Sequence, residues 1–318
     1  MAKRVKKKTV LITGATGFIG RHLVRRMVAL NHYSIVVISR FPKKAERLTN
    51  TGAIIVKADI TKKEDLRELT KFPVDIIIHC AALVESKKKK MLDKVNIAGT
   101  ENICKLAVEL GAERLVYLSS VAVVSGNRRV PLVENLPYFA TNLYGQSKLE
   151  AEKKVLLYRQ KGLPVVILRP PMVYGEDEPH ALPVLLNCLK WRIIPLLEGG
   201  KHKLHLAYVK NVVEAIIFAL ENKEMLKGSF FVADEQVLTT REVFKKMAEG
   251  AGAKLPLSVP HFLTPFFCNF PFLGRYFKFF LKDRAYSIEK IESLGFKPPY
   301  RAEDALAKSS KACFENKR

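Results

Sequence analysis

The most constraining feature of the sequence is an apolar strand pattern that runs directly into three glycines, TVLITGATGFIG at residues 9–20. The apolar run does not alternate with polar residues, which is typical of a central parallel strand covered on both faces. In such a turn the first glycine allows the tight bend, the second lets backbone approach a pyrophosphate, and the third lets the next helix pack close. The start of that helix offers unpaired N–H groups to an anion, so we expect a dinucleotide-binding turn; the alternative is a strand-to-helix turn without a ligand. The residues expected to contact the cofactor here are Gly14, Thr16, Gly17, Phe18, Ile19 and Gly20.

Apolar strand patterns alternate with helical patterns along the first half of the chain. This alternation predicts an α/β fold with a doubly wound parallel sheet. After Pro170 and Pro171 the alternation ends and prolines and aromatics become frequent, which predicts a smaller C-terminal substrate-binding lobe. We expect a dinucleotide-binding domain at residues 1–175, to which residues 206–233 return, and a substrate lobe at residues 176–318. The expected strands are residues 9–13, 35–39, 53–57, 74–79, 114–119 and 165–169.

The composition limits the class of protein and its partners. The 318 residues are 48% hydrophobic, which suffices for a large core and a second lobe. The formal net charge of +23 indicates either an acidic partner or a lysine-rich surface without one. No nucleic-acid-binding or zinc signature is present, so we expect neither nucleic acid nor metal binding. The five cysteines are widely spaced and no signal-peptide pattern opens the sequence, which favours reduced thiols in the cytoplasm.

The end of the second expected strand bears on the choice of cofactor. An NAD site usually carries Asp or Glu about 20 residues after the glycine turn, where it binds the ribose 2′-hydroxyl. Here Ser39 and Arg40 occupy that place, followed by Lys43 and Lys44. Arg40 can pair with a 2′-phosphate, so we expect NADP, with NAD possible; the alternative is a solvated basic loop.

A tyrosine and a lysine four residues apart form the candidate catalytic pair. In LYGQSK, Tyr144 and Lys148 fall on one face of a helix. A nearby ammonium favours the phenolate, so we expect Lys148 to lower the pKa of Tyr144 and to hydrogen-bond the nicotinamide ribose. Ser119 and Ser120 end the fifth expected strand, and one of them is expected to hydrogen-bond the substrate oxygen while Tyr144 transfers the proton. The alternatives are an amphipathic helix and a simple turn.

Taken together, these motifs resemble the extended short-chain dehydrogenase/reductases of the NAD-dependent epimerase/dehydratase superfamily. TGATGFIG, HCAA, NIAGTEN, YGQSK, RPPMVYG and YVKNV occur in the order typical of that family. The resemblance implies an NAD(P)-dependent enzyme and favours Ser120 over Ser119. It further implies cofactor contacts from Asp59, Ile60, Ala81, Ala82, Asn96, Lys148, Pro170 and Val173. Asp59 can alternatively cap the next helix.

Within that family, the sequence is closest in motifs to the 3β-hydroxysteroid dehydrogenase and dihydroflavonol reductase-like branch. The Asn and Arg with which nucleotide-sugar enzymes hold their substrate are absent. Leu204 and His205 occupy the position where those enzymes carry Arg followed by Asp. We therefore expect an oxidoreductase acting on a secondary alcohol or ketone of a hydrophobic, steroid-, flavonoid- or lipid-like substrate. A nucleotide-sugar epimerase or dehydratase and a non-catalytic NADP-binding protein are the alternatives. The resemblance also implies a homodimer.

One aromatic stretch at residues 255–282 is not explained by the cofactor site. Prolines interrupt its first part, and cations alternate with aromatics in RYFKFFLK. This pattern predicts either peripheral contact with an anionic membrane, centred on Phe279 and Phe280, or a lid over an apolar pocket.

Overall fold

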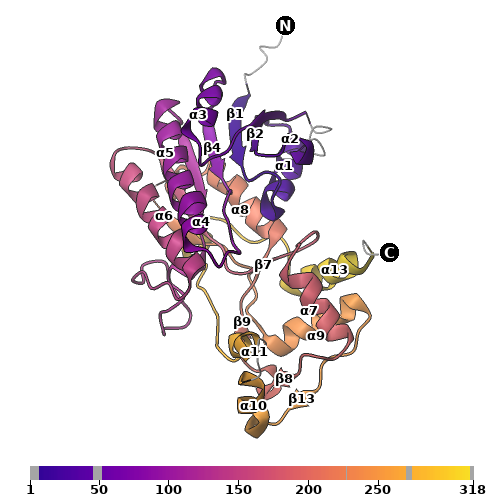
Figure 1. Ribbon diagram of the computed structural model, residues 1–318. Coiled ribbons are helices and arrows are strands. Elements are labelled where there is room, and N and C mark those ends of the chain that lie inside the picture. The colour runs from indigo at the N-terminus through magenta and orange to yellow at the C-terminus, as the bar shows by residue number, and fades with distance from the viewer. Residues whose placement is uncertain (1–6, 46–51, 227, 270–273, 316–318) are drawn as a thin grey trace. The chain divides into compact units, whose positions relative to one another are not determined.

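The computed structural model describes residues 7–45, 52–226, 228–269 and 274–315. A seven-stranded parallel sheet forms its centre, in the order β11-β6-β5-β4-β1-β2-β3 (Figure 1). The order reverses at β1, where the chain crosses from β3 to β4, and ligands of such sheets bind outside the carboxyl ends of strands at this point. The predicted fold class is therefore confirmed. The strands are β1 Lys8–Thr13, β2 Tyr33–Ser39, β3 Ile54–Lys57, β4 Ile76–His79, β5 Arg114–Leu118, β6 Val165–Arg169 and β11 Ser229–Phe231.

The strand β11 was not expected from the sequence. It contains only three residues, which is too short for a periodic pattern, and it pairs in parallel with β6, so that Phe230 lies opposite Leu168. The other six strands agree with the expected segments to within two residues at each end.

Helices cover both faces of the sheet (Figure 1). One face packs against α5 (Gly99–Glu109) and α6 (Leu143–Gln160), where Leu11, Leu115 and Ile167 join a buried apolar cluster with both helices. The other face carries α1 (Phe18–Leu30) and α8 (Val209–Glu221), which an ion pair between Arg26 and Glu214 connects. Shorter elements complete this part of the chain: α2 Pro42–Ala45, α3 Lys63–Arg67, η2 Glu68–Lys71, α4 Lys89–Leu92, the π-helical η3 Asp93–Ala98, η4 Val121–Val123 and η6 Lys223–Met225.

The chain divides into two compact units. The first comprises Met1–Asn127, Glu134–Pro170 and Val213–Phe231, and the second comprises Arg128–Val133, Pro171–Val212 and Val232–Arg318. The sheet and α6 lie in the first unit. The sequence set the boundary at residue 175 and expected residues 206–233 to return, whereas the returning segment here is Val213–Phe231.

The second unit is built from three short strand pairs and several helices. Helix α9 carries a capping box, in which Thr239 and Glu242 satisfy each other's backbone N–H groups. Gly250 of α9 lies directly against the backbone of Ala307 in α13, so a side chain at this position would push the two helices apart. The strands are β7 Val173–Tyr174 with β10 Ala207–Tyr208, β9 Lys203–Leu204 with β12 Leu238–Thr239, and β8 Leu196–Leu197 with β13 Ser258–Val259. The helices are α7 Ala181–Lys190, η5 Glu198–Gly200, α9 Thr240–Ala251, η7 His261–Leu263, α10 Thr264–Cys268, α11 Gly274–Phe280, α12 Glu289–Glu292 and α13 Ala302–Glu315.

Within the described ranges, no helix is both long enough and apolar enough to cross a membrane.

Candidate active site

The glycine turn lies between β1 and α1. Gly14 adopts a φ of +71°, which favours glycine, and a Cβ there would come within 2.7 Å of the backbone nitrogen of Ala81. Gly20 lies against the backbone of Gly14 and Ala15, so a side chain there would separate the helix from the turn. Gly17 differs from both, because it is exposed and a Cβ would meet only the carbonyl oxygen of Gly14, at 3.1 Å. The backbone at Gly17 is therefore open to a close-fitting ligand.

The N-terminus of α1 is suited to hold a phosphate group. Gly17 is its N-cap, no side chain caps the helix, and its first turn contains no acidic residue. The N–H groups of Phe18, Ile19 and Gly20 precede the first intrahelical donors, so they point toward the open turn with the positive end of the helix dipole. These features fit the pyrophosphate of a dinucleotide. Thr16 is half-buried in the same turn.

A buried histidine connects the glycine turn to the end of β4. His79 bonds Thr13 through Nδ1 at 2.7 Å and Thr100 through Nε2 at 2.9 Å. Burial lowers the pKa of His79 to about 3, so the ring is neutral. Thr13 in turn accepts the N–H of Ala81 at 3.1 Å, which holds Ala81 beside Gly14. Ala82 follows and is exposed.

Asn96 uses its amide inside the protein. Its oxygen accepts the N–H of Leu83 at 2.7 Å, and its nitrogen donates to the carbonyl of Leu83 and to Ser147. Asn96 is buried in the π-helical η3, a type of segment that often marks functional sites. It therefore connects the loop after Ala82 to α6, the helix of the candidate catalytic pair, and the cofactor contact expected of Asn96 stays a prediction.

The residues expected at the adenosine end directly follow β2 and β3. Arg40 is exposed beside the ring of Phe41, with Lys44 on the same ring, so two cations gather at the end of β2. Asp59 accepts the N–H of Thr61 at 2.9 Å in a local turn, and it does not cap α3, whose N-cap is Lys62 without a side-chain hydrogen bond. Ile60 is buried and contacts the position of Gly99, where a Cβ would meet its side chain at 2.8 Å.

Tyr144 lies in the first turn of α6. Asn142 caps this helix by accepting the N–H of Gly145 at 2.8 Å. A Cβ on Gly145 would come within 2.9 Å of the carbonyl oxygen of Ala122, so this glycine lets the helix start close to the loop after β5. Tyr144 hydrogen-bonds Ser120 there. Burial raises the pKa of Tyr144 to about 12, and the bond to Ser120 offsets part of this effect.

Lys148 follows one turn later and is almost fully buried. Its Nζ donates to the carbonyl oxygen of Leu118 at 2.8 Å and lies 4.3 Å from the ring centroid of Tyr117. Burial lowers the pKa of Lys148 to about 7, although the negative charge of Glu152 opposes this shift. The sequence predicted that Lys148 lowers the pKa of Tyr144. In the structure the ammonium is directed toward Leu118, and burial decides the pKa of the phenol instead.

The two serines at the end of β5 have different partners. Ser119 donates its hydroxyl hydrogen to the carboxylate of Glu152, whereas Ser120 accepts the N–H of Ala122 at 3.2 Å and bonds Tyr144. Only Ser120 therefore shares a hydrogen bond with the candidate catalytic tyrosine.

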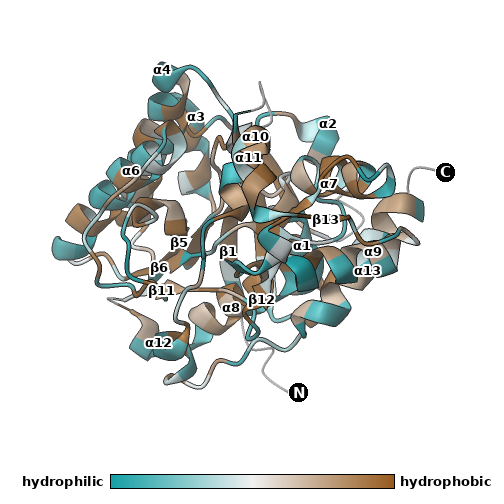
Figure 2. Ribbon diagram, turned by 90° about the horizontal axis from the view of Figure 1, so that it is seen from below, coloured by the Kyte–Doolittle hydropathy of each residue, from teal (hydrophilic) through white to brown (hydrophobic). Residues whose placement is uncertain are grey.

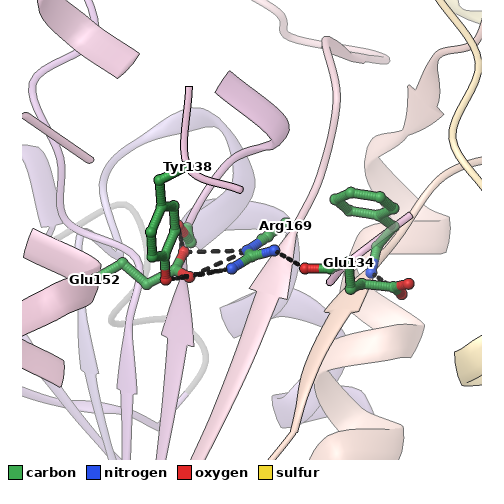
Figure 3. Close-up of polar contacts among 6 residues, drawn as sticks. Glu134, Tyr138, Glu152 and Arg169 are labelled. Carbon is green, nitrogen blue, oxygen red and sulfur yellow. Dashed lines mark hydrogen bonds and ion pairs between the residues drawn. The ribbon is translucent and has the colours of Figure 1, made fainter. Parts of the chain in front are cut away.

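Sequence reasoning missed the polar network beneath these serines. The guanidinium of Arg169, at the end of β6, forms a buried ion pair with Glu152 of α6 (Figure 3). Tyr138 donates to the same carboxylate at 2.7 Å, and Arg169 donates to the backbone carbonyl of Glu134 at 2.9 Å. The sequence signal that could have identified this network is the position of Glu152. It is four residues after Lys148 and eight after Tyr144, so it shares their helix face.

The last two expected contacts fall in different units. Pro170 ends the first unit and accepts the N–H of Val121 at 3.1 Å, so it supports the loop that carries Ser120. Val173 belongs to β7 in the second unit, where it pairs with Ala207.

The chain is similar in sequence and in fold to known enzymes. A family model described as the NAD dependent epimerase/dehydratase family matches residues 10–233. The chain is 27% identical to UDP-glucose 4-epimerase of Vibrio cholerae, over 98% of this chain and 97% of that protein. It is 26% identical to the 4-hydroxy-2-methyl-3-oxo-4-farnesyl-3,4-dihydroquinoline-1-oxide ketoreductase of Stigmatella aurantiaca, over 76% of this chain and 73% of that protein. The fold matches the crystal structure of UDP-glucuronic acid 4-epimerase from Bacillus cereus in complex with NAD with a TM-score of 0.80, at 20% identity over 98% of this chain and 100% of that one.

Proposed function

The chain belongs to the NAD dependent epimerase/dehydratase family and is an enzyme of the extended short-chain dehydrogenase/reductase type, and from this premise we propose that it interconverts a secondary alcohol and a ketone. The observation that carries the proposal is the state of Tyr144. Its pKa is raised to about 12, and it shares a hydrogen bond with Ser120 at the carboxyl end of the sheet. A phenol with this pKa is protonated at neutral pH, as ketone reduction requires of a proton donor.

In the proposed mechanism each residue has one task. Ser120 hydrogen-bonds the carbonyl oxygen of the ketone and holds it beside Tyr144. Tyr144 donates its proton to that oxygen as negative charge develops there, and takes it back in the reverse direction. When bound, the nicotinamide supplies or accepts the hydride. Lys148 would hydrogen-bond the nicotinamide ribose, and its bond to the carbonyl oxygen of Leu118 joins α6 to the end of β5.

We propose that the cofactor is NADP, held by the glycine turn and by Arg40. The open backbone at Gly17 and the uncapped N-terminus of α1 fit a pyrophosphate. The pair of cations at Phe41, Arg40 and Lys44, supports a 2′-phosphate rather than a free hydroxyl. Asp59, Ile60, Ala81, Ala82, Pro170 and Val173 complete the proposed set.

A nucleotide-sugar epimerase is the second candidate, because the relative from Vibrio cholerae bears that name. Leu204 and His205, which stand where nucleotide-sugar enzymes carry Arg followed by Asp, argue against this function. His205 is buried, donates to the carbonyl oxygen of Asp234 through Nε2 at 2.6 Å and accepts the N–H of Tyr286 through Nδ1. Its ring nitrogens are therefore both used inside the second unit. Leu204 beside it is buried and apolar.

We propose that the second unit binds a hydrophobic substrate. The ketoreductase from Stigmatella aurantiaca, whose named substrate carries a farnesyl group, supports this class. Some aromatics expected to line a pocket have another role, because Phe277 is buried and Phe280 packs edge-on against Phe244 at 5.2 Å. These rings form part of the core of the lobe.

We further propose a homodimer in the cytoplasm. Val108 on α5 and Leu157 on α6 are exposed apolar side chains on two adjoining helices, which supports self-association there. All five cysteines are free thiols, as a reducing compartment requires.

The test is turnover of ketones by purified protein, followed by the absorbance of NADPH. A panel of steroid, flavonoid and polyprenylated ketones should contain a substrate. Tyr144→Phe should reduce kcat by about 10²–10⁴-fold while cofactor affinity is kept. Tyr158→Phe, on the same helix, is the matched control and should retain activity. Unchanged kcat in Tyr144→Phe would remove the mechanism, and conversion of a UDP-sugar by protein that retains bound NAD, without ketone turnover, would establish the epimerase.

A further inference from the structure

Large apolar side chains are unusually exposed in one part of the second unit. Phe262 is 75% exposed and Trp191 is 72% exposed, the two highest values among the large hydrophobic residues of the described chain. Leu257 and Phe266 follow at 66% each, and Ile193 is also exposed. Exposed patches of this kind mark interaction sites on soluble domains. We call these five residues, Trp191, Ile193, Leu257, Phe262 and Phe266, the aromatic face.

The two segments that carry the aromatic face lie side by side. Strand β8 pairs in parallel with β13, and the N–H of Leu196 bonds the carbonyl oxygen of Leu257 at 2.9 Å. His261, which follows β13, lies 3.3 Å from the carboxylate of Glu198, which follows β8. Residues 191–197 and 257–266 are therefore one surface region, and β8, β13 and α10 appear together in Figure 1. The ribbon of α10 is predominantly hydrophobic in Figure 2.

The charges around the aromatic face have one sign. Residues 179–197 contain Lys190 and Arg192, and residues 250–269 contain Lys254, with no Asp or Glu in either segment. All three cations are exposed. Glu178, Glu198 and Glu249 border these segments; Glu198 is paired with Lys201 and two histidines, and Glu249 with Lys246. Lys190 also lies over the ring of Phe314, at 5.6 Å from its centroid. Exposed rings beside exposed cations complement a lipid surface, whose acyl chains are apolar and whose phosphates are anionic.

We propose that the aromatic face is a docking surface for an anionic lipid bilayer. The rings and aliphatic side chains enter the boundary between headgroups and acyl chains, where Trp is favoured, and the cations pair with lipid phosphates. The docking residues differ from those that the sequence suggested. Phe280 packs against Phe244 and Phe279 lies under the guanidinium of Arg284, so among the described side chains of residues 255–282 the proposed lipid-facing rings are Phe262 and Phe266. This inference concerns where the lobe binds and does not depend on the proposed reaction.

Flotation with liposomes tests the proposal on the full chain. At low salt the protein should float with vesicles of phosphatidylcholine and phosphatidylserine and much less with phosphatidylcholine alone. Phe262→Ser with Phe266→Ser should reduce the partition coefficient at least tenfold. The matched control is Phe139→Ser, which alters an exposed phenylalanine in the first unit. Circular dichroism and thermal unfolding show that each variant remains folded.

A charge series tests the electrostatic part independently of the rings. Lys190→Glu and Arg192→Glu should each weaken binding to phosphatidylserine vesicles by about fivefold or more, the effect of one cation near an anionic surface. Lys63→Glu, an exposed lysine of α3, should have little effect. Binding should fall as salt rises.

Three outcomes would overturn the proposal. The first is absence of binding to anionic vesicles at low salt. The second is equal loss of binding in Phe139→Ser and in the double variant, because the effect would then be unspecific. The third is a concentration-dependent oligomer, measured by light scattering, that the double variant abolishes while vesicle binding is unchanged, because the aromatic face would then join two copies of the chain.

Discussion

Ser119 donates its hydroxyl hydrogen to the buried carboxylate of Glu152, directly before the serine that bonds Tyr144. Glu152 is fully buried, and Arg169 neutralises it from the neighbouring strand (Figure 3). The strand end that presents Ser120 is thus joined to the helix that presents Tyr144 and Lys148. A buried pair of this kind strongly destabilises a protein when only one partner is removed. We infer that the pair positions the catalytic residues and does not touch substrate.

The two serines should therefore respond differently to substitution. Ser120→Ala should reduce kcat by about 10²–10³-fold, because a hydrogen bond to the reacting oxygen is lost. Ser119→Ala should instead lower the free energy of unfolding by about 1–3 kcal/mol, because Glu152 loses a buried donor, while KM changes little. Steady-state kinetics and urea unfolding of both variants provide the measurements. A larger loss of kcat in Ser119→Ala than in Ser120→Ala would exchange the two roles.

The buried Lys148 should make stability depend on pH in the alkaline range. Its pKa is about 7 in the folded protein, below the ordinary lysine value of 10.5, since burial disfavours the charged form. Between pH 7 and pH 10.5 the lysine is protonated in the unfolded chain and largely unprotonated in the folded protein. The free energy of unfolding should therefore rise with pH by at most about 1.4 kcal/mol per pH unit. Below pH 7 both states hold the proton and this contribution no longer changes. Lys148→Met should remove the slope, while Lys153→Met, exposed on the same helix, should keep it. If the free energy of unfolding, measured with urea, rose equally with pH in the parent protein and in Lys148→Met, the assignment to Lys148 would be contradicted.

Gly17→Ala should weaken cofactor binding with little effect on the fold. Gly17 has a φ of −76°, which alanine adopts without strain, and its Cβ would point into open space except for the carbonyl oxygen of Gly14. We expect a loss of stability within about 1 kcal/mol, the scale of an N-cap change, and a rise in Kd of at least tenfold. Gly14→Ala should show the opposite pattern, because its positive φ and its contact with Ala81 strain the turn itself. Thermal unfolding without cofactor and calorimetric titration with NADPH separate the two effects, and normal NADPH affinity in a folded Gly17→Ala would refute this placement of the phosphate.

Arg40→Asp should change the preference between cofactors. Loss of a charge-assisted bond to the 2′-phosphate should weaken NADPH binding by about 1.5–3 kcal/mol and leave NADH binding nearly unchanged. Arg67→Asp, an exposed arginine of α3, serves as the control for net charge. Equal affinity of the parent protein for NADPH and NADH would exclude a role of Arg40 in selection.

The sequence by itself determined the features that depend on neighbouring residues. A strand, a glycine turn and a helix follow one another within residues 8–30, and their conformations depend on local backbone freedom and apolar periodicity. The positions of Tyr144 and Lys148 on one helix face follow from four-residue spacing alone. Six of the seven strands of the central sheet were predicted from their runs of apolar residues.

Only the tertiary structure decided which group meets which partner. Ser119 and Ser120 are chemically identical, and their roles separate because Glu152, 33 residues further along the chain, accepts a hydrogen bond from the first. Lys148 was expected to lower the pKa of Tyr144, but the carbonyl of Leu118 receives its ammonium, and burial, which arises from packing, raises that pKa instead. Similarly, Phe262 and Phe280 belong to one aromatic stretch, and Phe280 is half-buried whereas Phe262 is exposed, because Phe244 of α9 packs on Phe280. Contacts between distant segments determine burial and hydrogen-bond partners, and a linear pattern does not contain them.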